Sequence, residues 1–440
     1  MAAFFASGSI VHDFIDTYIT QNPTILKIAA NDNEIVNEWY TLIHLESGAY
    51  GTVRINKSRE YVVKQMNIIR QIEKGEMYAM NIIRNEVLIY HYISQKCEGV
   101  CSFIGCYYHK SARLLYVKSK YCGKDLHTKL FGDFHQRFNF DTKRAIFGKI
   151  IDNLKCLHDN GVVYRDLKPE NITVSDDNTV TFIDFGLSYF CGNAVISDEL
   201  KMNQDRNIIG TKLYGDPTQP IADDDELKKT DTYSLGVLFM MMFSDPKYLD
   251  FLITFSGTSF MSRVEKLDET SQKSFWIDFN EKIKLILGDG IDNTNFFGGF
   301  DTRLTSADLQ NAFNRPISPE YHDAALLYDN KISSIDKSIS QRSSNKNKIV
   351  SKRSSNNIKS VSKNSSASNS SASNSSASNS SLNKIYIPNQ NTMPNQIIMP
   401  IGIRGQPPIS YSNSYSKKEG GNNKTKRHKK TRSRKTYRRK

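Results

Sequence analysis

The 440-residue chain is long enough to bury one large core or two ordinary ones, and it lacks an uninterrupted run of 18 apolar residues, which argues against a membrane span. Residues 1–329 carry 35 basic and 44 acidic residues, a net charge of −9, whereas residues 330–440 carry 24 basic and 2 acidic residues, a net charge of +22. The sequence therefore predicts an acidic folded part and a strongly basic tail, and its first residues lack the basic segment of a secretory signal.

Six cysteines are spread along the folded part. None forms a C-x-x-C pair, and six cysteines in so long a chain do not make a dense disulfide framework. We expect buried, reduced thiols in an intracellular protein, cytoplasmic or nuclear, with a metal site as the alternative. The cysteines are Cys97, Cys101, Cys106, Cys122, Cys156 and Cys191.

Composition divides the chain into five parts. Residues 1–38 form an N-terminal extension that precedes the expected folded domain, residues 39–325. Residues 326–384 are a Ser/Asn-rich linker with SSASN repeats, which has no apolar face to bury and is expected to be disordered. Residues 385–416 combine Pro, Ile and Asn as a candidate docking segment, and residues 417–440 are the basic tail.

A glycine-bearing turn between two β-type runs lies in HLESGAYGTVRINKSREYVVKQM, residues 44–66. Gly48 and Gly51 allow backbone amides to approach a phosphate because no side chain intervenes, although a turn with two glycines is more often only a turn. The candidate binding residues of this turn are Glu46, Ser47, Gly48, Ala49, Tyr50, Gly51, Thr52 and Val53.

Lys64 ends the second β-type run, and Glu86 follows in MNIIRNEVLIYHYI, which has the periodicity of an amphipathic helix. Glu86 lies among the apolar positions of that helix, so it is expected to face inward. A buried carboxylate is costly unless it is paired, and Lys64 is a suitable partner; an exposed helix glutamate is the alternative.

Charged and amide side chains crowd together in YRDLKPEN, residues 164–171, after a short apolar strand. Two further short strands follow, and the second ends at Asp184 in the sequence DFG. Asp166, Lys168, Asn171 and Asp184 are therefore expected at strand ends on one side of a hairpin, where side chains can converge on a ligand.

Taken in order, these motifs resemble the eukaryotic-type serine/threonine protein kinase family. The resemblance implies an α+β fold of two lobes: a small antiparallel β lobe with one helix, and a larger, mainly α-helical lobe. It also implies an ATP-dependent phosphotransferase that uses Mg²⁺ and moves the γ-phosphoryl group to serine or threonine hydroxyls of proteins.

The resemblance also assigns roles to the charged residues of the catalytic segment. Asp166 would orient the substrate hydroxyl or accept its proton, and Lys168 would steady the transferred phosphoryl group. Asn171 and Asp184 would hold magnesium, which neutralises part of the triphosphate charge.

In the first lobe, the resemblance implies that Lys64 holds the α- and β-phosphates and that Glu86 fixes Lys64. The segment LLYVKSKYCGKDL is similar to the family's interlobe hinge. Lys120 to Cys122 would offer backbone groups to adenine, with Ser119 as the gatekeeper.

Two downstream segments extend the resemblance. In IIGTKLYGDP, Thr211 is expected to hydrogen-bond near Asp166 and Lys168, which together with DLKPEN is typical of serine/threonine kinases. The sequence KTDTYSLGVLFMMMF resembles the family's long buried helix, with Asp231 capping it and Tyr233 where Trp is usual.

Several positions depart from the family pattern. Glu46 stands where the glycine-rich loop begins with Gly, so nucleotide affinity is expected to fall unless the carboxylate points away. Tyr164 stands where His is commoner. Asp216, in DPT, replaces the family's glutamate and is expected to pair with Arg303.

No Ser, Thr or Tyr lies between Glu199 and Gly210, where activating phosphorylation usually falls. We expect activity without loop phosphorylation, with the carboxylate of Asp205 or Asp198 beside Arg165 in place of a phosphate; a solvated loop acid is the alternative.

The expected partners are protein substrates, with a preference for basic ones because the folded part is acidic, and the tail is a candidate for self-phosphorylation. Residues 417–440 form either a solvated tail, a polyanion contact such as nucleic acid, or a nuclear address. Two alternatives to catalysis stay open: a pseudokinase scaffold that binds nucleotide weakly, and a polyanion-associated protein that acts through its tail. The abundance of Asn, Ile and Lys also resembles proteins of large DNA viruses.

Overall fold

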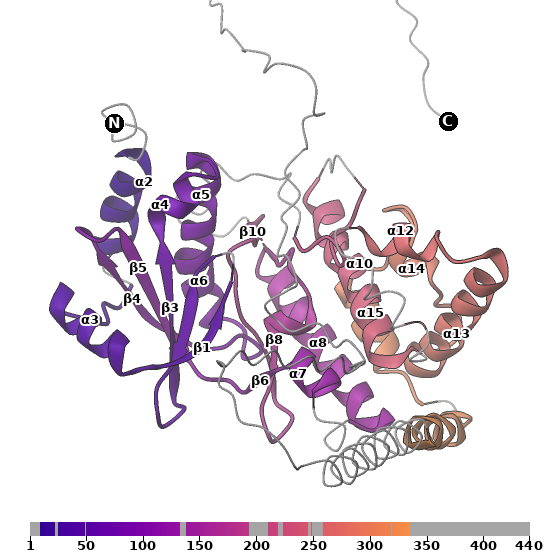
Figure 1. Cartoon of the computed structure of the whole chain (residues 1–440). Helices are drawn as coiled ribbons and strands as arrows, with labels where there is room; N and C mark the ends of the chain where they lie inside the picture. The colour runs from indigo at the N-terminus through magenta and orange to yellow at the C-terminus, as the bar shows by residue number, and fades with distance from the viewer. Residues whose placement is uncertain are drawn as a thin grey trace, which may run out of the picture. The chain divides into compact units, whose positions relative to one another are not determined.

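The computed structural model describes residues 9–22, 25–48, 50–132, 138–192, 210–218, 223–244, 248, 258–317 and 319–334. The predictions for Ala49, for Asp198 and Asp205, and for residues 335–440 concern parts of the chain outside these ranges. Within them, a β-sheet with helices precedes a mainly helical part (Figure 1), which confirms the predicted α+β kinase fold.

A five-stranded antiparallel sheet forms the first part of the domain, in the order β1-β2-β3-β5-β4. Its strands are β1 (Ile43–Ser47), β2 (Thr52–Ile55), β3 (Tyr61–Asn67), β4 (Phe103–His109) and β5 (Leu114–Lys120). Lys64 of β3 lies opposite Val53 of β2 and Val117 of β5. β3 therefore has a hydrogen-bonded neighbour on each side, and this fixes the backbone that carries Lys64.

A helical segment packs against the sheet and carries Glu86. It comprises α4 (Ile68–Ile72), α5 (Glu76–Arg84), η2 (Asn85–Ile89) and α6 (Tyr90–Ser94). Ile82, Ile83 and Val87 are fully buried and share one core with Met66 of the sheet. The helix predicted over residues 80–93 is thus confirmed, with a single π-helical turn at Glu86, a type of distortion that is frequent at functional sites.

In the described residues before the sheet there are three helical elements: α2 (Ser9–Phe14), η1 (Ile15–Thr20) and α3 (Asp32–Thr41). Because side chains alternate along a strand, the sheet buries a different set on each face. Val63 and Tyr116 form a separate core cluster with Ile35 and Trp39 of α3, whereas α2 packs against α5. The extension therefore contributes buried side chains to two cores.

The second part of the domain is mainly helical. Its elements are α7 (Leu126–Phe131), α8 (Phe140–Asp159), α10 (Asp224–Phe243), α12 (Phe260–Val264), α13 (Glu269–Leu287), α14 (Thr294–Phe297) and α15 (Ser306–Phe313). Phe147 of α8 and Phe239 of α10 meet edge to face with ring centroids 5.2 Å apart, a favourable aromatic geometry. Almost every residue of α10 from Thr230 to Phe243 is buried, so this helix is the centre of the helical core.

Short strands between α7 and α10 place the catalytic segment. They are β6 (Lys124–Asp125), β7 (Val162–Val163), β8 (Ile172–Val174), β9 (Val180–Phe182) and β10 (Tyr189–Phe190), with the 3₁₀ turn η4 (Pro169–Asn171) before β8. Ile172 of β8 pairs with Phe182 of β9. Asn171 and Asp184 therefore lie at the same end of this hairpin, as predicted.

The long helix α10 begins earlier than the sequence suggested. Asp223 caps it by accepting a hydrogen bond from the amide of Glu226, at 2.7 Å. The prediction that Asp231 is the cap is wrong, because the acidic run at residues 223–226 is helical and supplies both the cap and the first turn. Asp231 instead lies inside the helix, fully buried.

A helix over residues 321–334 follows α15, so the predicted domain boundary at residue 325 falls inside it. Tyr328 packs edge to face on Phe140 at the start of α8, with centroids 5.0 Å apart. The backbone amide of Phe140 donates to Asp329 at 2.9 Å. These contacts explain why the ordered helix continues past the change in composition.

Two disulfide bonds show that the expectation of reduced thiols is wrong for four cysteines. Cys97, after α6, is bonded to Cys156 of α8, and Cys101 is bonded to Cys122. The partners are 59 and 21 residues apart, and only the packing of the turn after α6 brings them together. Sequence spacing does not encode that proximity.

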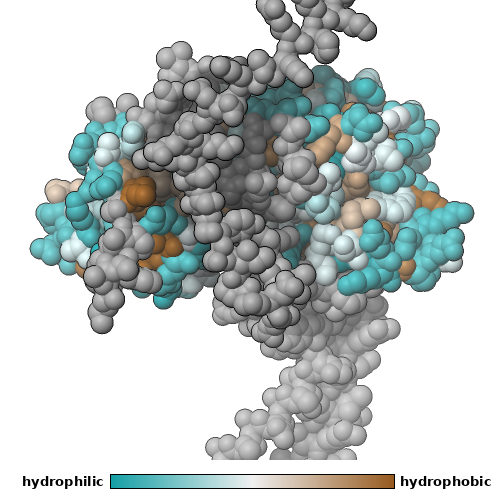
Figure 2. Space-filling model, turned by 90° about the horizontal axis from the view of Figure 1, so that it is seen from above, coloured by the Kyte–Doolittle hydropathy of each residue, from teal (hydrophilic) through white to brown (hydrophobic). Residues whose placement is uncertain are grey.

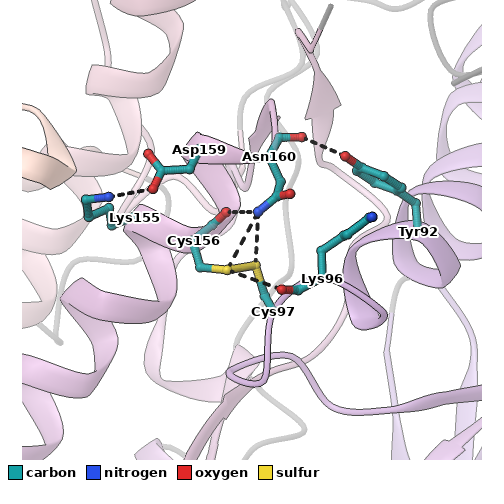
Figure 3. The surroundings of a disulfide bond; sticks show 7 residues. All are labelled: Tyr92, Lys96, Cys97, Lys155, Cys156, Asp159 and Asn160. Atoms are coloured by element: carbon teal, nitrogen blue, oxygen red, sulfur yellow. Dashed lines mark hydrogen bonds and ion pairs between the residues drawn. A yellow bond between two sulfur atoms is a disulfide. The ribbon is translucent and has the colours of Figure 1, made fainter. Parts of the chain in front are cut away.

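Figure 3 shows the first of these bonds beside the end of α8. The side-chain nitrogen of Asn160 donates to the backbone carbonyl of Cys156 at 2.8 Å. The same nitrogen lies 3.7 Å from each of the two bonded sulfur atoms. The two free cysteines of the described chain are Cys106, which is buried, and Cys191. The metal alternative gains no support, because no three metal-ligating side chains cluster among the described residues.

The described surface seen in Figure 2 is mostly hydrophilic, with small hydrophobic spots. This agrees with the collection of apolar side chains in the cores. No helix in the described ranges is long and apolar enough to cross a membrane.

Candidate active site

Asp231 of α10 holds the start of the segment YRDLKPEN, residues 164–171, through hydrogen bonds. Its carboxylate accepts hydrogen bonds from the backbone amides of Tyr164 and Arg165, both at 2.7 Å, and contacts Nε2 of His158 at 3.0 Å. Arg165 has φ of 65°, in the left-handed region that non-glycine residues rarely adopt. Hydrogen bonds from two backbone amides to one buried carboxylate fix this conformation at the residue before Asp166.

Asp166 is the centre of a hydrogen-bonded group. The side-chain amide of Asn171 donates to its carboxylate at 2.8 Å and to its carbonyl at 2.9 Å, and Nζ of Lys168 lies 3.0 Å from the same carboxylate. Thr211 donates to the other carboxylate oxygen through its amide and its hydroxyl, at 3.0 and 2.9 Å, and the hydroxyl accepts from Lys168 at 2.9 Å. The predicted contacts of Thr211 are confirmed.

Lys64 joins the sheet to the second half of the site. Its Nζ lies 2.9 Å from Glu86 and 3.0 Å from Asp184, so the predicted Lys64–Glu86 ion pair is present. Burial alone would lower the pKa of Lys64, but the two carboxylates outweigh burial and raise it. Burial raises the pKa of Glu86 to about 8, although Lys64 opposes the shift. Burial also disfavours the Asp184 carboxylate, but Lys64 and Lys168 outweigh it and lower its pKa.

The glycine-bearing turn joins β1 to β2, and Glu46, Ser47, Thr52 and Val53 lie on these two strands. The amide of Gly48 donates to the carbonyl of Gly51 at 2.8 Å, which closes the turn. A Cβ at Gly51 would lie 2.2 Å from the carbonyl oxygen of Gln65 in β3, so glycine is required there.

Glu46 lies on β1, whose residues are all exposed. Although solvent reaches its side chain, the surrounding protein desolvates it and, with Asp125 and Asp184, raises its pKa. Tyr50 is folded inward: its ring is buried, its hydroxyl lies 3.5 Å from that of Tyr78 in α5, and Nζ of Lys64 lies 5.9 Å from its centroid.

The structure supports only part of the prediction that the backbone of Lys120 to Cys122 is available to adenine. The amide of Lys120 donates to Ser102 at 2.9 Å, and the amide of Tyr121 donates to Glu60 at 2.9 Å, so both are used within the protein. Cys122 is held by its disulfide to Cys101, and its amide donates no hydrogen bond to a described residue. Among these three amides, that of Cys122 is the one left to meet a ligand.

The predicted pair Asp216–Arg303 is confirmed. Both Arg303 Nη atoms donate to the Asp216 carboxylate, one of them at 3.2 Å, and both side chains are buried. Arg303 also donates to the hydroxyl of Thr218 at 3.2 Å. Asp216 therefore fills, with a shorter side chain, the place of the usual glutamate.

Sequence reasoning missed a link between the glutamate helix and the DFG segment. The side-chain amide of Asn85 donates to the carbonyls of Gly186 and Ser188, at 3.0 and 2.6 Å. The sequence signal was an Asn beside Glu86, on a helix whose neighbouring positions Val87, Leu88 and Ile89 are apolar. Tyr164, noted as a variant, stacks on Phe182 and donates its hydroxyl to the carbonyl of Ile183.

Residues 41–289 match the family described as the protein kinase domain. The chain belongs to the protein kinase family. The match extends over more than half of the chain and contains every residue of the site described above except Arg303, which follows it.

Several curated proteins are similar to this kinase. The 3-phosphoinositide-dependent protein kinase 1 of Caenorhabditis elegans is 25% identical over 313 residues, which cover 62% of this chain and 46% of that protein. The serine/threonine-protein kinase STE20 of Debaryomyces hansenii is 27% identical over 264 residues, 56% of this chain and 23% of that protein. Serine/threonine-protein kinase shk1/pak1 of Schizosaccharomyces pombe is 26% identical over 259 residues, which cover 56% of this chain and 34% of that protein. The chain thus spans less than half the length of these relatives.

Proposed function

We propose that this kinase transfers the γ-phosphoryl group of ATP, with Mg²⁺, to serine or threonine hydroxyls of protein substrates. The observation that carries the proposal is the meeting of Lys64 and Asp184 beside the group formed by Asp166, Lys168 and Asn171. The two groups adjoin along the backbone, because the amide of Ile183, the residue before Asp184, donates to the carbonyl of Asn171 at 3.0 Å.

The donor set fits magnesium. Both hydrogen bonds made by the Asn171 side chain use its nitrogen, which leaves its carbonyl oxygen for a metal. Lys64 and the amide of Gly186 both donate to Oδ1 of Asp184, at 3.0 and 3.4 Å, so neither of them uses Oδ2. Mg²⁺ is usually held by one or two protein oxygens, with phosphates and water completing its shell. When bound with ATP, it would supply positive charge at the phosphates.

Asp166 is placed to act on the substrate. Its carboxylate already accepts from Asn171, Thr211 and Lys168, so it is held in one orientation as an acceptor for a hydroxyl proton. The ammonium groups of Lys64 and Lys168 would neutralise the phosphates, since they stay protonated with raised pKa values. The Lys168–Thr211 contact supports a serine or threonine substrate, as do the names of the relatives.

A pseudokinase scaffold is not favoured. It would be supported by Glu46 near the phosphate-binding turn, but Lys64, Asp166, Asn171 and Asp184 are all present and in contact with one another or with Glu86. Contact of residues 417–440 with polyanions is a separate proposal, supported by their charge alone; equal binding of nucleic acid by chains with and without these residues, at rising salt, would refute it.

The test uses the full-length chain, ATP labelled on the γ-phosphate, Mg²⁺ and a generic basic protein. Asp166→Asn is expected to lower kcat by about 10²- to 10⁴-fold, the usual contribution of a positioned base. Asp176→Asn, a matched change at an exposed position in the β8–β9 turn, should leave kcat unchanged. Equal rates for both variants, or label transfer to tyrosine only, would contradict the proposal.

A further inference from the structure

The N-terminal extension, residues 9–41 of the described chain, packs around the β4 edge of the sheet. α2 lies beside α5 (Figure 1), and η1 contacts β4. The following residues 25–28 run along β4, and α3 covers the other face of the sheet. This is more than a terminal segment resting on a surface, because the extension contacts the glutamate helix, the edge strand and the sheet in turn.

The helical part of the extension is anchored by apolar burial. Val11, Phe14, Ile15 and Ile19 are between 0 and 4% exposed. The helix α2, which carries Val11 and Phe14, contacts α5 directly, and η1, which carries Ile15 and Ile19, contacts β4. Removing the extension would therefore expose apolar surface on the helical segment that carries Glu86.

Polar contacts fix the extension to the edge strand at two further points. The hydroxyl of Tyr108 lies 2.5 Å from Nδ1 of His12, with the rings stacked, and Nζ of Lys110 lies 2.5 Å from Asp16. Both partners lie in β4 or the turn that follows it. The contacts set the rotation of α2 and η1 relative to the sheet.

The edge strand is shaped to receive the extension. The amide of Cys106 donates to the carbonyl of Leu26 at 3.0 Å, and the amide of Ile28 donates to Cys106 at 3.3 Å. A Cβ at Gly105 would lie 2.4 Å from the Leu26 carbonyl and 2.8 Å from Ile28. Any side chain at position 105 would therefore push this segment away.

We propose that α2 and η1 are an internal brace that holds α5 and η2 against the sheet and so keeps Glu86 on Lys64. Phe14 is then a positioning residue for phosphoryl transfer, although it touches no reacting group. A glutamate helix held in this way needs no separate protein to complete its contact with Lys64. The effect on rate rests on the proposed function, whereas the effect on the helix does not.

The experiment compares full-length variants by hydrogen exchange of residues 76–94 and by kcat and KM for ATP. Phe14→Asp should raise exchange in residues 76–94 and lower kcat by about 5- to 150-fold, the usual range of coupling between sites. Ile10→Asp is the matched control, because Ile10 is 56% exposed on the same helix. It should change neither quantity. Phe14→Leu should retain the wild-type values.

Gly105→Val tests the brace from the sheet side and should reproduce the effect of Phe14→Asp. If Phe14→Asp prevents folding, the same measurements on Phe14→Ala and Gly105→Val test the brace. Raised exchange confined to residues 9–22, with exchange in residues 76–94 and kcat unchanged, overturns the brace. An inactive wild-type chain refutes the proposed function alone, since the exchange data still test the brace.

Discussion

At the scale of single residues, short polar side chains do the positioning. Asp231 fixes the strained backbone before Asp166, and Asn85 ties the glutamate helix to the segment after Asp184. Neither residue is among those proposed to contact the phosphates. Each instead holds the backbone beside a charged residue of the site. Its loss would therefore displace that charged residue without changing its charge.

The buried pair Asp216–Arg303 yields a prediction at this scale. Asp216→Ala leaves a guanidinium buried without its carboxylate, so the free energy of unfolding should fall by about 3–5 kcal/mol. A double-mutant cycle with Arg303→Met, followed by chemical denaturation, measures the coupling. Coupling near zero would mean that the contact is incidental. Asp289→Ala is the comparison, because Asp289 pairs with Lys284 at an exposed site and should change stability by less than about 1 kcal/mol.

At the scale of secondary-structure elements, the contact of α2 with the sheet should depend on pH. Burial, together with the charge of Arg113, lowers the pKa of His12, with Asp16 and Asp13 opposing the shift. The folded state therefore binds this proton less readily than the unfolded state. Stability from the neutral ring is present above about pH 6.5 and is lost as the pH falls below it.

Hydrogen exchange of residues 9–22 should consequently increase, relative to α10, between pH 7.5 and 5.5 after correction for intrinsic rates. His12→Gln removes the titrating group and should flatten this difference. An unchanged pH response in that variant would assign the effect to another group.

The elements also show what the sequence could and could not predict. Lys64 and Glu86 were predicted as a pair from β alternation and helix periodicity, which are local, whereas the roles of Asp166 and Thr211 followed from the resemblance to the kinase family. The start of α10 was misplaced because an acidic run was not read as a cap. The hinge amides and the inward fold of Tyr50 depend on neighbours from distant segments, which one sequence does not reveal.

At the scale of the whole molecule, one disulfide joins the first part of the domain to the helical part, and the other closes a loop that contains β4 and β5. Cys97–Cys156 joins the end of the glutamate helix to α8, and Cys101–Cys122 joins the start of β4 to the hinge. Closing loops of 59 and 21 residues removes entropy from the unfolded chain, by roughly 4 and 3 kcal/mol on a chain-entropy estimate.

A dithiol reductant should therefore lower the temperature of unfolding measured by calorimetry. Cys97→Ser/Cys156→Ser should lose more stability than Cys101→Ser/Cys122→Ser, because its loop is longer. Cys191→Ser, which removes a free thiol, serves as the control. An oxidised wild type that melts together with the reduced protein would show that the bonds add nothing.

The bond between Cys97 and Cys156 also changes how the molecule carries mechanical load. Tension applied to the two ends would pass from one sulfur to the other and bypass the intervening polypeptide, including β4, β5 and the hinge. The loop would add about 200 Å of contour length, at roughly 3.4 Å per residue, only after the disulfide is reduced. Under tension this loop of 59 residues therefore stays closed while the rest of the chain is extended.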